Sequence, residues 1–308
     1  MSAAFLQDDQ LESLFDQIPA LAGRPRFITE LSGGLTNRNL KVTTPDGRFV
    51  ARCSGLGGDA LDIDRDVEYH NSCAAEKAGV GAPVVAYRPD LGVLVIEFLD
   101  GRTLSRETIR DQGVIERIAL SCRQLHAGPA FQGTFNMFER RQGYLRTVQR
   151  NGFRLPPGYL DHAEALGRIQ KALAVRDVGT VPCNNDLLAE NFVDDGEKVW
   201  LIDYEYSGNN DAAFELGNIW GECHLDLDQL DALVTAYYGR HRRSKIARAR
   251  LQGIVGQYGW TLWGAIQNAV SPVEYDFWEW TMGRFDMAVR EMQGPDFESL
   301  LHDVQLAD

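Results

Sequence analysis

The chain contains 308 residues, of which 44% are hydrophobic and 24% are charged, and its formal net charge is -13. This composition supplies enough apolar side chains for a packed core, so the sequence does not predict a disordered protein. The negative balance repels phosphate backbones and anionic lipid headgroups, which argues against nucleic-acid binding and stable membrane association. The length suggests one large domain or two lobes.

The five cysteines are widely spaced and include no CxxC pair. The first residues lack the basic segment and apolar stretch of a secretory signal, and no apolar run approaches the about 18 residues of a membrane span. We therefore expect a cytoplasmic protein with reduced thiols. The six histidines include no ligand-spaced pair, so no zinc site is predicted. The oligomeric state stays open, with a homodimer as one alternative.

The first hundred residues predict a small sheet. An amphipathic helix over residues 11–18 comes first, and a second helix over residues 63–78 ends at Gly79. Turn residues at 44–47 join two strands in a hairpin. Five strands are predicted, over residues 27–31, 39–43, 49–53, 84–87 and 92–99. The sheet they form is expected to be largely antiparallel.

The pattern becomes mainly helical after residue 99. Helices are predicted over residues 107–126, 161–176, 227–242, 245–268 and 274–292. One β-rich interruption, residues 181–206, contains turn residues at 194–197 that indicate a hairpin. The sequence therefore predicts an α+β fold with two lobes and a cleft, in which residues 1–99 form the sheet lobe and residues 100–308 the helical lobe.

The β-rich interruption carries the strongest chemical signal. Asp186 and Asn191 have the D-x4-N spacing of a kinase catalytic loop, and Asp203 follows 17 residues after Asp186, at the end of an apolar strand. Phosphoryl transfer needs a carboxylate at the acceptor hydroxyl and oxygen ligands for magnesium. Taken alone, the spacing can arise by chance and Asp203 can be a surface turn residue. The hairpin between the two elements favours the catalytic interpretation.

The sheet lobe offers groups that can hold phosphates. Gly33 and Gly34 lie between two strands, where glycines allow backbone N–H groups to approach a phosphate closely. Arg52 on a strand can pair with Glu68 on the helix, as a strand lysine does with a helix glutamate in protein kinases, and arginine is a bidentate phosphate donor. The alternative is an ordinary glycine hairpin with a surface Arg–Glu pair.

A dinucleotide-binding motif is a weaker interpretation of the same lobe. Residues 55–60 fit the pattern GxGxxA between a strand and a helix. However, Asp59, Asp62, Asp64 and Asp66 crowd the helix start, where they would repel a pyrophosphate. The neighbouring strands also form hairpins rather than βαβ units, so a Rossmann fold is not favoured.

The C-terminal region is rich in aromatic residues. Trp260 and Trp263 share one helix face, and Tyr275, Phe277 and Trp280 follow in the next predicted helix. Aromatic rings around a cation are a favoured host for a quaternary ammonium group. The alternative is that the rings pack the two helices together, which is the better interpretation of Phe277.

Together these residues resemble the choline/ethanolamine kinase family within the aminoglycoside phosphotransferase-like kinases. The resemblance extends over residues 31–292, most of the chain. The matching positions are residues 32–37, Asp64, Arg65, Glu68, Glu97, Phe98, Gly101, Leu125, His126, Asn185, Asp186, Asn191, residues 202–207, Gly217, Asn218, Glu222, residues 260–263, Gln267 and residues 284–286. The resemblance implies a bilobal protein-kinase-like fold and ATP- and magnesium-dependent phosphorylation of a small cationic amino alcohol, choline or ethanolamine.

The resemblance also implies roles for single residues. Asp186 would be the catalytic base, and Asn191 and Asp203 would hold magnesium. The implied ATP-binding residues are Gly33, Gly34, Thr36 and Asn37 in the loop, Arg52 supported by Glu68, and Glu97 and Leu99 in a hinge beside adenine. The implied amino-alcohol pocket consists of Tyr206, Glu222, Trp260, Trp263, Tyr275 and Trp280.

Three positions depart from the family pattern. Asn184 stands where the family has a histidine, Leu227 where the choline pocket has an aromatic residue, and Glu215 where an aspartate is usual. The resemblance implies that this histidine organises the loop, and asparagine can also bridge backbone groups, so we expect activity to survive. The alternatives are a kinase for an aminoglycoside, thiamine or another hydroxylated amine, or a catalytically weak nucleotide- or amine-binding protein.

Overall fold

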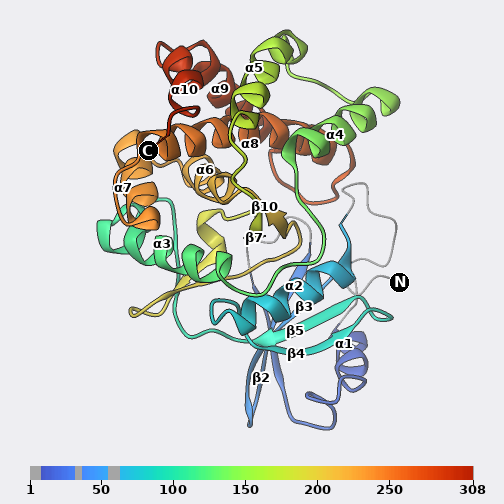
Figure 1. Cartoon of the computed structure of the whole chain (residues 1–308). Helices are drawn as coiled ribbons and strands as arrows, with labels where there is room; N and C mark the ends of the chain where they lie inside the picture. Colours follow the sequence, from blue (N-terminus) through green and yellow to red (C-terminus); the bar gives the residue numbers. More distant parts are fainter. Residues whose placement is uncertain (1–7, 32–36, 55–62, 308) are drawn as a thin grey trace.

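An antiparallel sheet of five strands forms one end of the molecule (Figure 1). The computed structural model describes residues 8–31, 37–54 and 63–307. The strands are β1 (Phe27–Leu31), β2 (Arg38–Thr44), β3 (Gly47–Cys53), β4 (Val84–Arg88) and β5 (Val93–Glu97). Their spatial order is β1-β2-β3-β5-β4, and every neighbouring pair is antiparallel. The predicted strands and the hairpin between β2 and β3 are confirmed.

Two helices accompany this sheet. Helix α1 (Asp8–Phe15) buries Leu11 and Phe15 in one cluster with Val42 and Val95 of the strands. Helix α2 (Arg65–Lys77) lies between the sheet and the helical remainder (Figure 1). Its first turn is capped by Asp64, whose side chain accepts hydrogen bonds from two backbone N–H groups. Helix α2 therefore lies where its side chains can contact both the sheet and the helical remainder.

Most of the remaining chain is helical, as predicted. The helices are α3 (Gln112–His126), α4 (Met137–Asn151), α5 (Ala163–Ala174), α6 (Ala212–Glu222), α7 (Leu227–Tyr238), α8 (Arg243–Val270), α9 (Phe277–Gln293) and α10 (Phe297–Asp303). Short 3-10 turns are η2 (Thr108–Arg110), η3 (Tyr159–His162) and η4 (Ala189–Asn191). The sequence did not predict α4, α6 or α10. The helix predicted from residue 107 begins at Gln112, because Asp111 caps it after η2.

Short strands connect the helices to the sheet. They are β6 (Arg102–Thr103), β7 (Val181–Cys183), β8 (Phe192–Asp194), β9 (Val199–Leu201) and β10 (Gly208–Asn210). Strands β8 and β9 form the predicted hairpin, and β6 pairs with β8 directly after the five-stranded sheet ends. Strand β7 pairs with β10, which brings together the segments on either side of that hairpin. The division into residues 1–99 and 100–308 stays a prediction.

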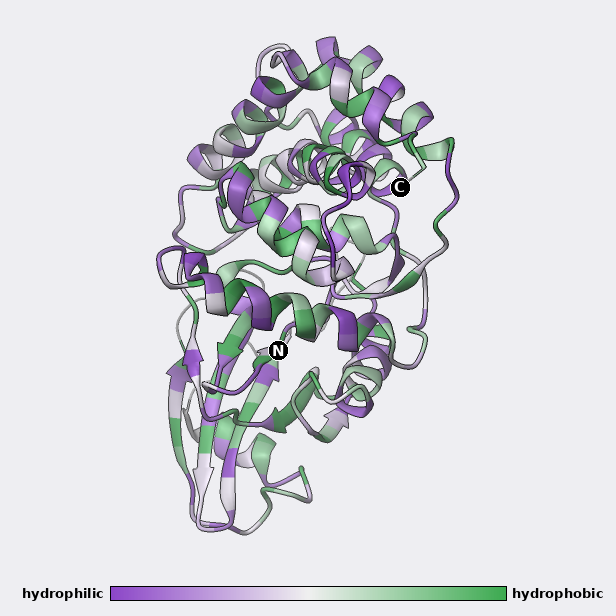
Figure 2. Ribbon diagram, turned by 60° about the vertical axis from the view of Figure 1, so that its left-hand side comes forward, coloured by the Kyte–Doolittle hydropathy of each residue, from purple (hydrophilic) through white to green (hydrophobic). Residues whose placement is uncertain are grey.

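Helix α8 is the centre of the helical part. It packs against α6 on one side and α9 on the other, and residues 251–267 are buried without interruption. Hydrophobic and hydrophilic residues share most of the surrounding helices (Figure 2), as expected for helices that cover a core with one face. Among the described helices, none combines the length and hydropathy that a membrane span requires.

The contact between α6 and α8 depends on two glycines. A Cβ atom added at Gly217 would overlap the carbonyl oxygen of Ala249 and lie 2.6 Å from the amide nitrogen of Gly253. Both neighbours belong to the α8 backbone and cannot rotate away. The two helices can therefore approach this closely only while position 217 lacks a side chain.

We predict that Gly217→Ala lowers the free energy of unfolding by about 3 kcal/mol, because the added methyl group pushes α6 away from α8. Gly167→Ala is the matched control, since a Cβ at that position in α5 meets nothing within 4 Å. It should raise stability by about 0.5 to 1 kcal/mol through helix propensity. Urea denaturation of both variants measures the difference, and equal stabilities would contradict the prediction.

Candidate active site

A cavity of about 570 Å³ lies between the five-stranded sheet and the helical part. Most of the described residues that the sequence predicted to bind nucleotide, metal or acceptor contribute to its wall. Those lining it are Asn37, Arg52, Glu97, Leu99, Asp186, Asn191, Asp203, Tyr206, Glu222, Trp260, Trp263 and Trp280. Three predicted phosphate-loop residues, Gly33, Gly34 and Thr36, lie outside the described residues, as do residues 55–60 of the rejected dinucleotide motif.

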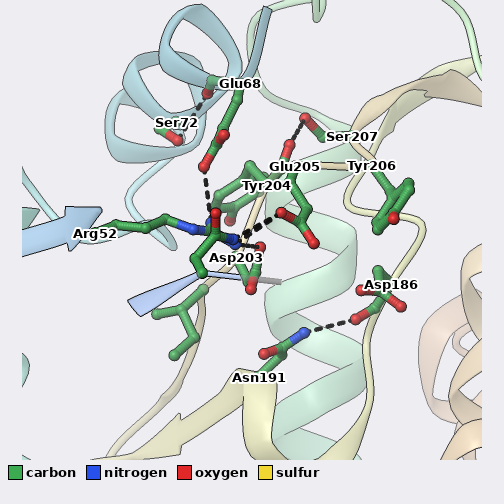
Figure 3. Close-up of polar contacts among 12 residues, drawn as sticks. Arg52, Glu68, Ser72, Asp186, Asn191, Asp203, Tyr204, Glu205, Tyr206 and Ser207 are labelled. Carbon is green, nitrogen blue, oxygen red and sulfur yellow. Dashed lines mark hydrogen bonds and ion pairs between the residues drawn. The ribbon is translucent and has the colours of Figure 1, made fainter. Parts of the chain in front are cut away.

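Arg52 on β3 connects the sheet to the segment that follows β9 (Figure 3). Its guanidinium donates to Glu68 at 2.7 Å, to Asp203 at 2.6 Å and to Glu205 at 3.1 Å. Burial alone would lower the pKa of Arg52, but the three carboxylates more than offset this and raise it. The predicted pairing of Arg52 with Glu68 is confirmed, and it is buried rather than on the surface, since the Glu68 side chain is 3% exposed.

A second arginine completes this ion network. Arg65 on α2 donates to Glu68 at 2.8 Å, to Glu205 at 3.2 Å and to the side-chain oxygen of Asn37 at 3.1 Å. The Asn37 amide in turn donates to Glu205 at 2.9 Å. The sequence did not predict that Arg65 and Glu205 belong to this ion network. The spacing of Arg65 three residues before Glu68 on a helix was the available signal.

Asn184 links the loop of residues 184–191 to the segment that follows β9. Its side-chain oxygen accepts the backbone N–H of Asp186 at 3.0 Å, and its amide nitrogen donates to the carbonyl groups of Ile202 at 3.1 Å and Asp203 at 2.7 Å. The side chain is fully buried, so these bonds have no competition from water. The expectation that asparagine bridges backbone groups here is confirmed.

The Glu215 carboxylate on α6 holds the same loop through hydrogen bonds. Its two carboxylate oxygens accept the backbone N–H groups of Asn184 at 2.8 Å and Asn185 at 2.7 Å, and the residue is completely buried. Asn185 and Asp203 both have left-handed backbones, with φ of 69° and 67°, and Asn and Asp tolerate this region better than most residues. Side-chain hydrogen bonds therefore hold the loop in this shape, and Glu215 is a positioning residue to which the sequence assigned no role.

Two side-chain oxygens near Asp186 remain available to a metal. Asn191 uses its amide nitrogen to bind the Asp186 carbonyl at 2.7 Å, which leaves its side-chain oxygen without a hydrogen bond from any described residue (Figure 3). Asp203 binds Arg52 through Oδ1, and its Oδ2 is likewise free among the described residues. Hard oxygen donors of this kind fit magnesium.

The acidic side chains of this region have perturbed protonation. Burial, followed by the charges of Asp203, Glu222 and Glu205, raises the pKa of Asp186 well above its ordinary value. Burial also raises the pKa of Asp203 to about 6, although Arg52 opposes the shift. Asp186 therefore holds a proton more strongly than an ordinary aspartate does.

Aromatic rings line the opposite end of the cavity. The Trp263 indole nitrogen donates to the Tyr206 hydroxyl at 2.8 Å, and that of Trp260 donates to Asn218 at 2.9 Å. The Trp280 ring lies 5.0 Å from that of Trp263, measured between centroids. Because the indole nitrogens of Trp260 and Trp263 are bound within the protein, these two residues present mainly ring surface to the cavity.

Two expected pocket positions lie elsewhere. Tyr275 is 47% exposed, precedes α9 and packs its ring against Phe277, so it is not part of the cavity lining. Leu227, the residue that replaces a family aromatic, is the first residue of α7 and is 43% exposed. It does not line the cavity either, so its substitution leaves the described wall unchanged.

Comparison with known proteins agrees with this geometry. The sequence model of a family described as choline/ethanolamine kinase matches residues 28–238. The chain belongs to the choline/ethanolamine kinase family. It is therefore a phosphotransferase that acts on an alcohol hydroxyl of a small molecule, and ATP use follows from the family.

Several relatives illustrate the match. The crystal structure of a choline/ethanolamine kinase family protein from Mesorhizobium loti has a TM-score of 0.86 and 32% identity, covering 97% of this chain and 99% of that one. Protein LicA of Haemophilus influenzae is 25% identical over 85% of this chain and 78% of its own length. Ethanolamine kinase 2 of Rattus norvegicus is 27% identical over 88% and 81%. The fold is protein-kinase-like, as in solved aminoglycoside phosphotransferases.

We predict that Asn184→Asp lowers kcat about 10- to 100-fold, because a carboxylate of the same shape cannot donate to the carbonyls of Ile202 and Asp203, and small misplacement of reacting groups costs about this much. Asn184→His should retain more activity than Asn184→Asp, since histidine can donate. Steady-state kinetics with saturating substrates measures the effect.

The matched control is Asn209→Asp. The Asn209 amide also donates to two backbone carbonyls, those of Phe131 and Gly133, but outside the catalytic loop. This variant should lose stability without a comparable loss of kcat. Equal kcat values for the Asn184→Asp and Asn209→Asp variants would show that Asn184 has only a structural role.

Proposed function

We propose that this kinase transfers the γ-phosphoryl group of ATP to the hydroxyl of choline or ethanolamine in a magnesium-dependent reaction. The observation that carries the proposal is one cavity whose wall contains the Asp186 carboxylate, the side chains of Asn191 and Asp203, and several aromatic rings. The names of the relatives, which include both ethanolamine kinases and choline kinases, support the two acceptors without choosing between them.

The nucleotide is proposed to occupy the sheet side of the cavity. Glu97 and Leu99 lie at the end of β5, where the chain leaves the sheet, and would flank adenine. Arg52 would contact the phosphates, since its guanidinium reaches the cavity wall and is held in place by Glu68. Magnesium held by Asn191 and Asp203 would supply positive charge against the phosphate oxygens.

Asp186 is proposed to accept the proton of the acceptor hydroxyl. As that oxygen forms its bond to the γ-phosphorus, the bond from phosphorus to the β-phosphate oxygen breaks and ADP leaves. The raised pKa of Asp186 supports the role of base, and Asn184 and Glu215 fix the loop that carries it. The chain thus contributes mainly positioning and charge, as expected for phosphoryl transfer.

The amine of the acceptor is proposed to lie against the aromatic wall. Tyr206, Trp260, Trp263 and Trp280 present ring surface there, and Glu222 adds a carboxylate from α6. Ring faces attract a cation through their quadrupole, which favours an ammonium group at this wall. A neutral or polyanionic acceptor would find no matching group at this end.

We predict magnesium-dependent ADP release with choline or ethanolamine, and loss of kcat by a factor of about 100 to 10,000 in Asp186→Asn, which keeps the shape and removes the base. A coupled ADP assay across amino alcohols, thiamine and aminoglycosides measures this. ATP affinity of the variant should stay close to that of the native protein. Turnover only with an aminoglycoside or thiamine, or ATP binding without turnover, would contradict the proposed function.

We also predict that Trp260→Leu lowers kcat/KM for choline by about 2- to 30-fold, because leucine keeps apolar bulk but removes the ring face that binds a cation. Trp278→Leu is the matched control, since Trp278 lies on α9, does not line the cavity and instead stacks under Arg154 at 3.6 Å. Comparable losses in the two variants would contradict an ammonium site at the aromatic wall.

A further inference from the structure

Glu222, a buried carboxylate in the cavity wall, is already paired within the protein. Its Oε1 accepts a hydrogen bond from the side-chain amide of Gln257 at 2.7 Å, and its Oε2 accepts one from the guanidinium of Arg284. All three residues are at most 6% exposed. Each oxygen of this acid therefore has a donor before any substrate amine arrives.

Arg284 also covers one face of a ring of the pocket. Its guanidinium carbon lies 3.3 Å from the centroid of the Trp280 ring, four residues earlier on α9. Trp280 lines the cavity and Arg284 does not, so the arginine occupies the side of the ring that is turned away from the acceptor. The same guanidinium thus neutralises Glu222 and fixes the orientation of Trp280.

The other polar groups of the cavity wall include the Tyr206 hydroxyl, which already accepts a hydrogen bond from Trp263. The indole nitrogens of Trp260 and Trp263 are donors, and both are bound within the protein. Glu190 lines the cavity but is exposed to water. The Asp186 carboxylate accepts no hydrogen bond from a described residue, but the proposed reaction assigns it to the acceptor hydroxyl.

We propose that Arg284 is a specificity-determining residue that makes the pocket select a quaternary ammonium alcohol over a primary one. A primary ammonium has three N–H donors that need acceptors, whereas a trimethylammonium has none and binds ring surface. By pairing with Glu222, Arg284 neutralises the charge of this acid and occupies a lone pair of Oε2. The acid is then a weaker acceptor for a primary ammonium, while the ring surface stays in place. This inference rests on the proposed function, and it selects choline from the two acceptors.

A methylation series on the full-length native protein provides the first test. The acceptors are ethanolamine, its N-methyl and N,N-dimethyl derivatives, and choline, which differ only in the number of N–H donors and methyl groups. We expect kcat/KM to rise along this series, with choline preferred over ethanolamine by about tenfold or more. Equal values, or a preference for ethanolamine, would overturn the inference and leave the proposed function intact. Transfer to none of the four would overturn both.

Two variants test the role of the Glu222 pair directly. Arg284→Met releases Oε2, and we expect it to lower the ratio of kcat/KM for choline to that for ethanolamine by about tenfold. Both acceptors use the same base and nucleotide site, so the ratio cancels general damage to catalysis. Gln257→Met releases Oε1 without leaving a buried charge unpaired, and it should shift the ratio in the same direction even if Arg284→Met fails to fold.

A second charge cluster in the protein supplies matched controls. Asp211 accepts hydrogen bonds from Arg248 at 2.6 Å and from Gln252 at 2.9 Å, all three residues are buried, and none lines the cavity. Arg248→Met and Gln252→Met remove equivalent bonds and should leave the choline to ethanolamine ratio within about twofold of the native value. A ratio that is unchanged in the Arg284 and Gln257 variants, or changed equally in the controls, would overturn the role assigned to Arg284.

Discussion

The ion network around Arg52 is the interaction on which the cavity depends. Glu68, Asp203 and Glu205 place three carboxylates close together in a largely buried region, which is unfavourable unless cations compensate them. Arg52 from β3 and Arg65 from α2 supply these cations. Since Asp203 and Glu205 follow β9, neutralising their charge requires the sheet and the helical part to meet at this point.

A second series of contacts holds the loop that carries Asp186. It begins where α6 packs on α8. Close packing of α6 on α8 at Gly217 fixes the position of α6, and α6 carries Glu215 under the loop. Glu215 binds two loop N–H groups, and Asn184 then links the loop to Asp203. A small displacement of α6 would therefore shift Asp186 through the hydrogen bonds that Glu215 and Asn184 make with the loop.

The sequence predicted the parts of the site that depend on spacing along the chain. Asp186, Asn191 and Asp203 were recognised because a hairpin signal lies between them, and that hairpin is present. Helix α6 was missed because residues 213–222 are buried on every side, so its sequence lacks the polar and apolar alternation of an amphipathic helix. The roles of Glu215 and Arg284 depend on contacts between distant segments, which spacing does not encode.

Tyr275 shows that residue spacing does not determine where a helix begins. Its spacing to Trp280 places both residues in one predicted helix, but α9 begins only at Phe277, after Asp276 caps it. The residue therefore precedes the helix and its ring contacts Phe277 instead of the cavity. A shift of three residues in a helix start is enough to remove a side chain from a site.

The two ends of α6 show why Glu222 is best understood through binding rather than stability. Asp211 caps the N-terminus, where the helix dipole favours a negative charge, and Glu222 is the last residue, where the dipole opposes one. Each acid is buried and held by one arginine and one glutamine, but only Asp211 gains from its position on the helix. A carboxylate at the unfavourable end of a helix, in a cavity wall that also contains aromatic rings, fits the proposed cationic acceptor better than a role in stability, and its arginine partner would set how much of that charge the acceptor meets.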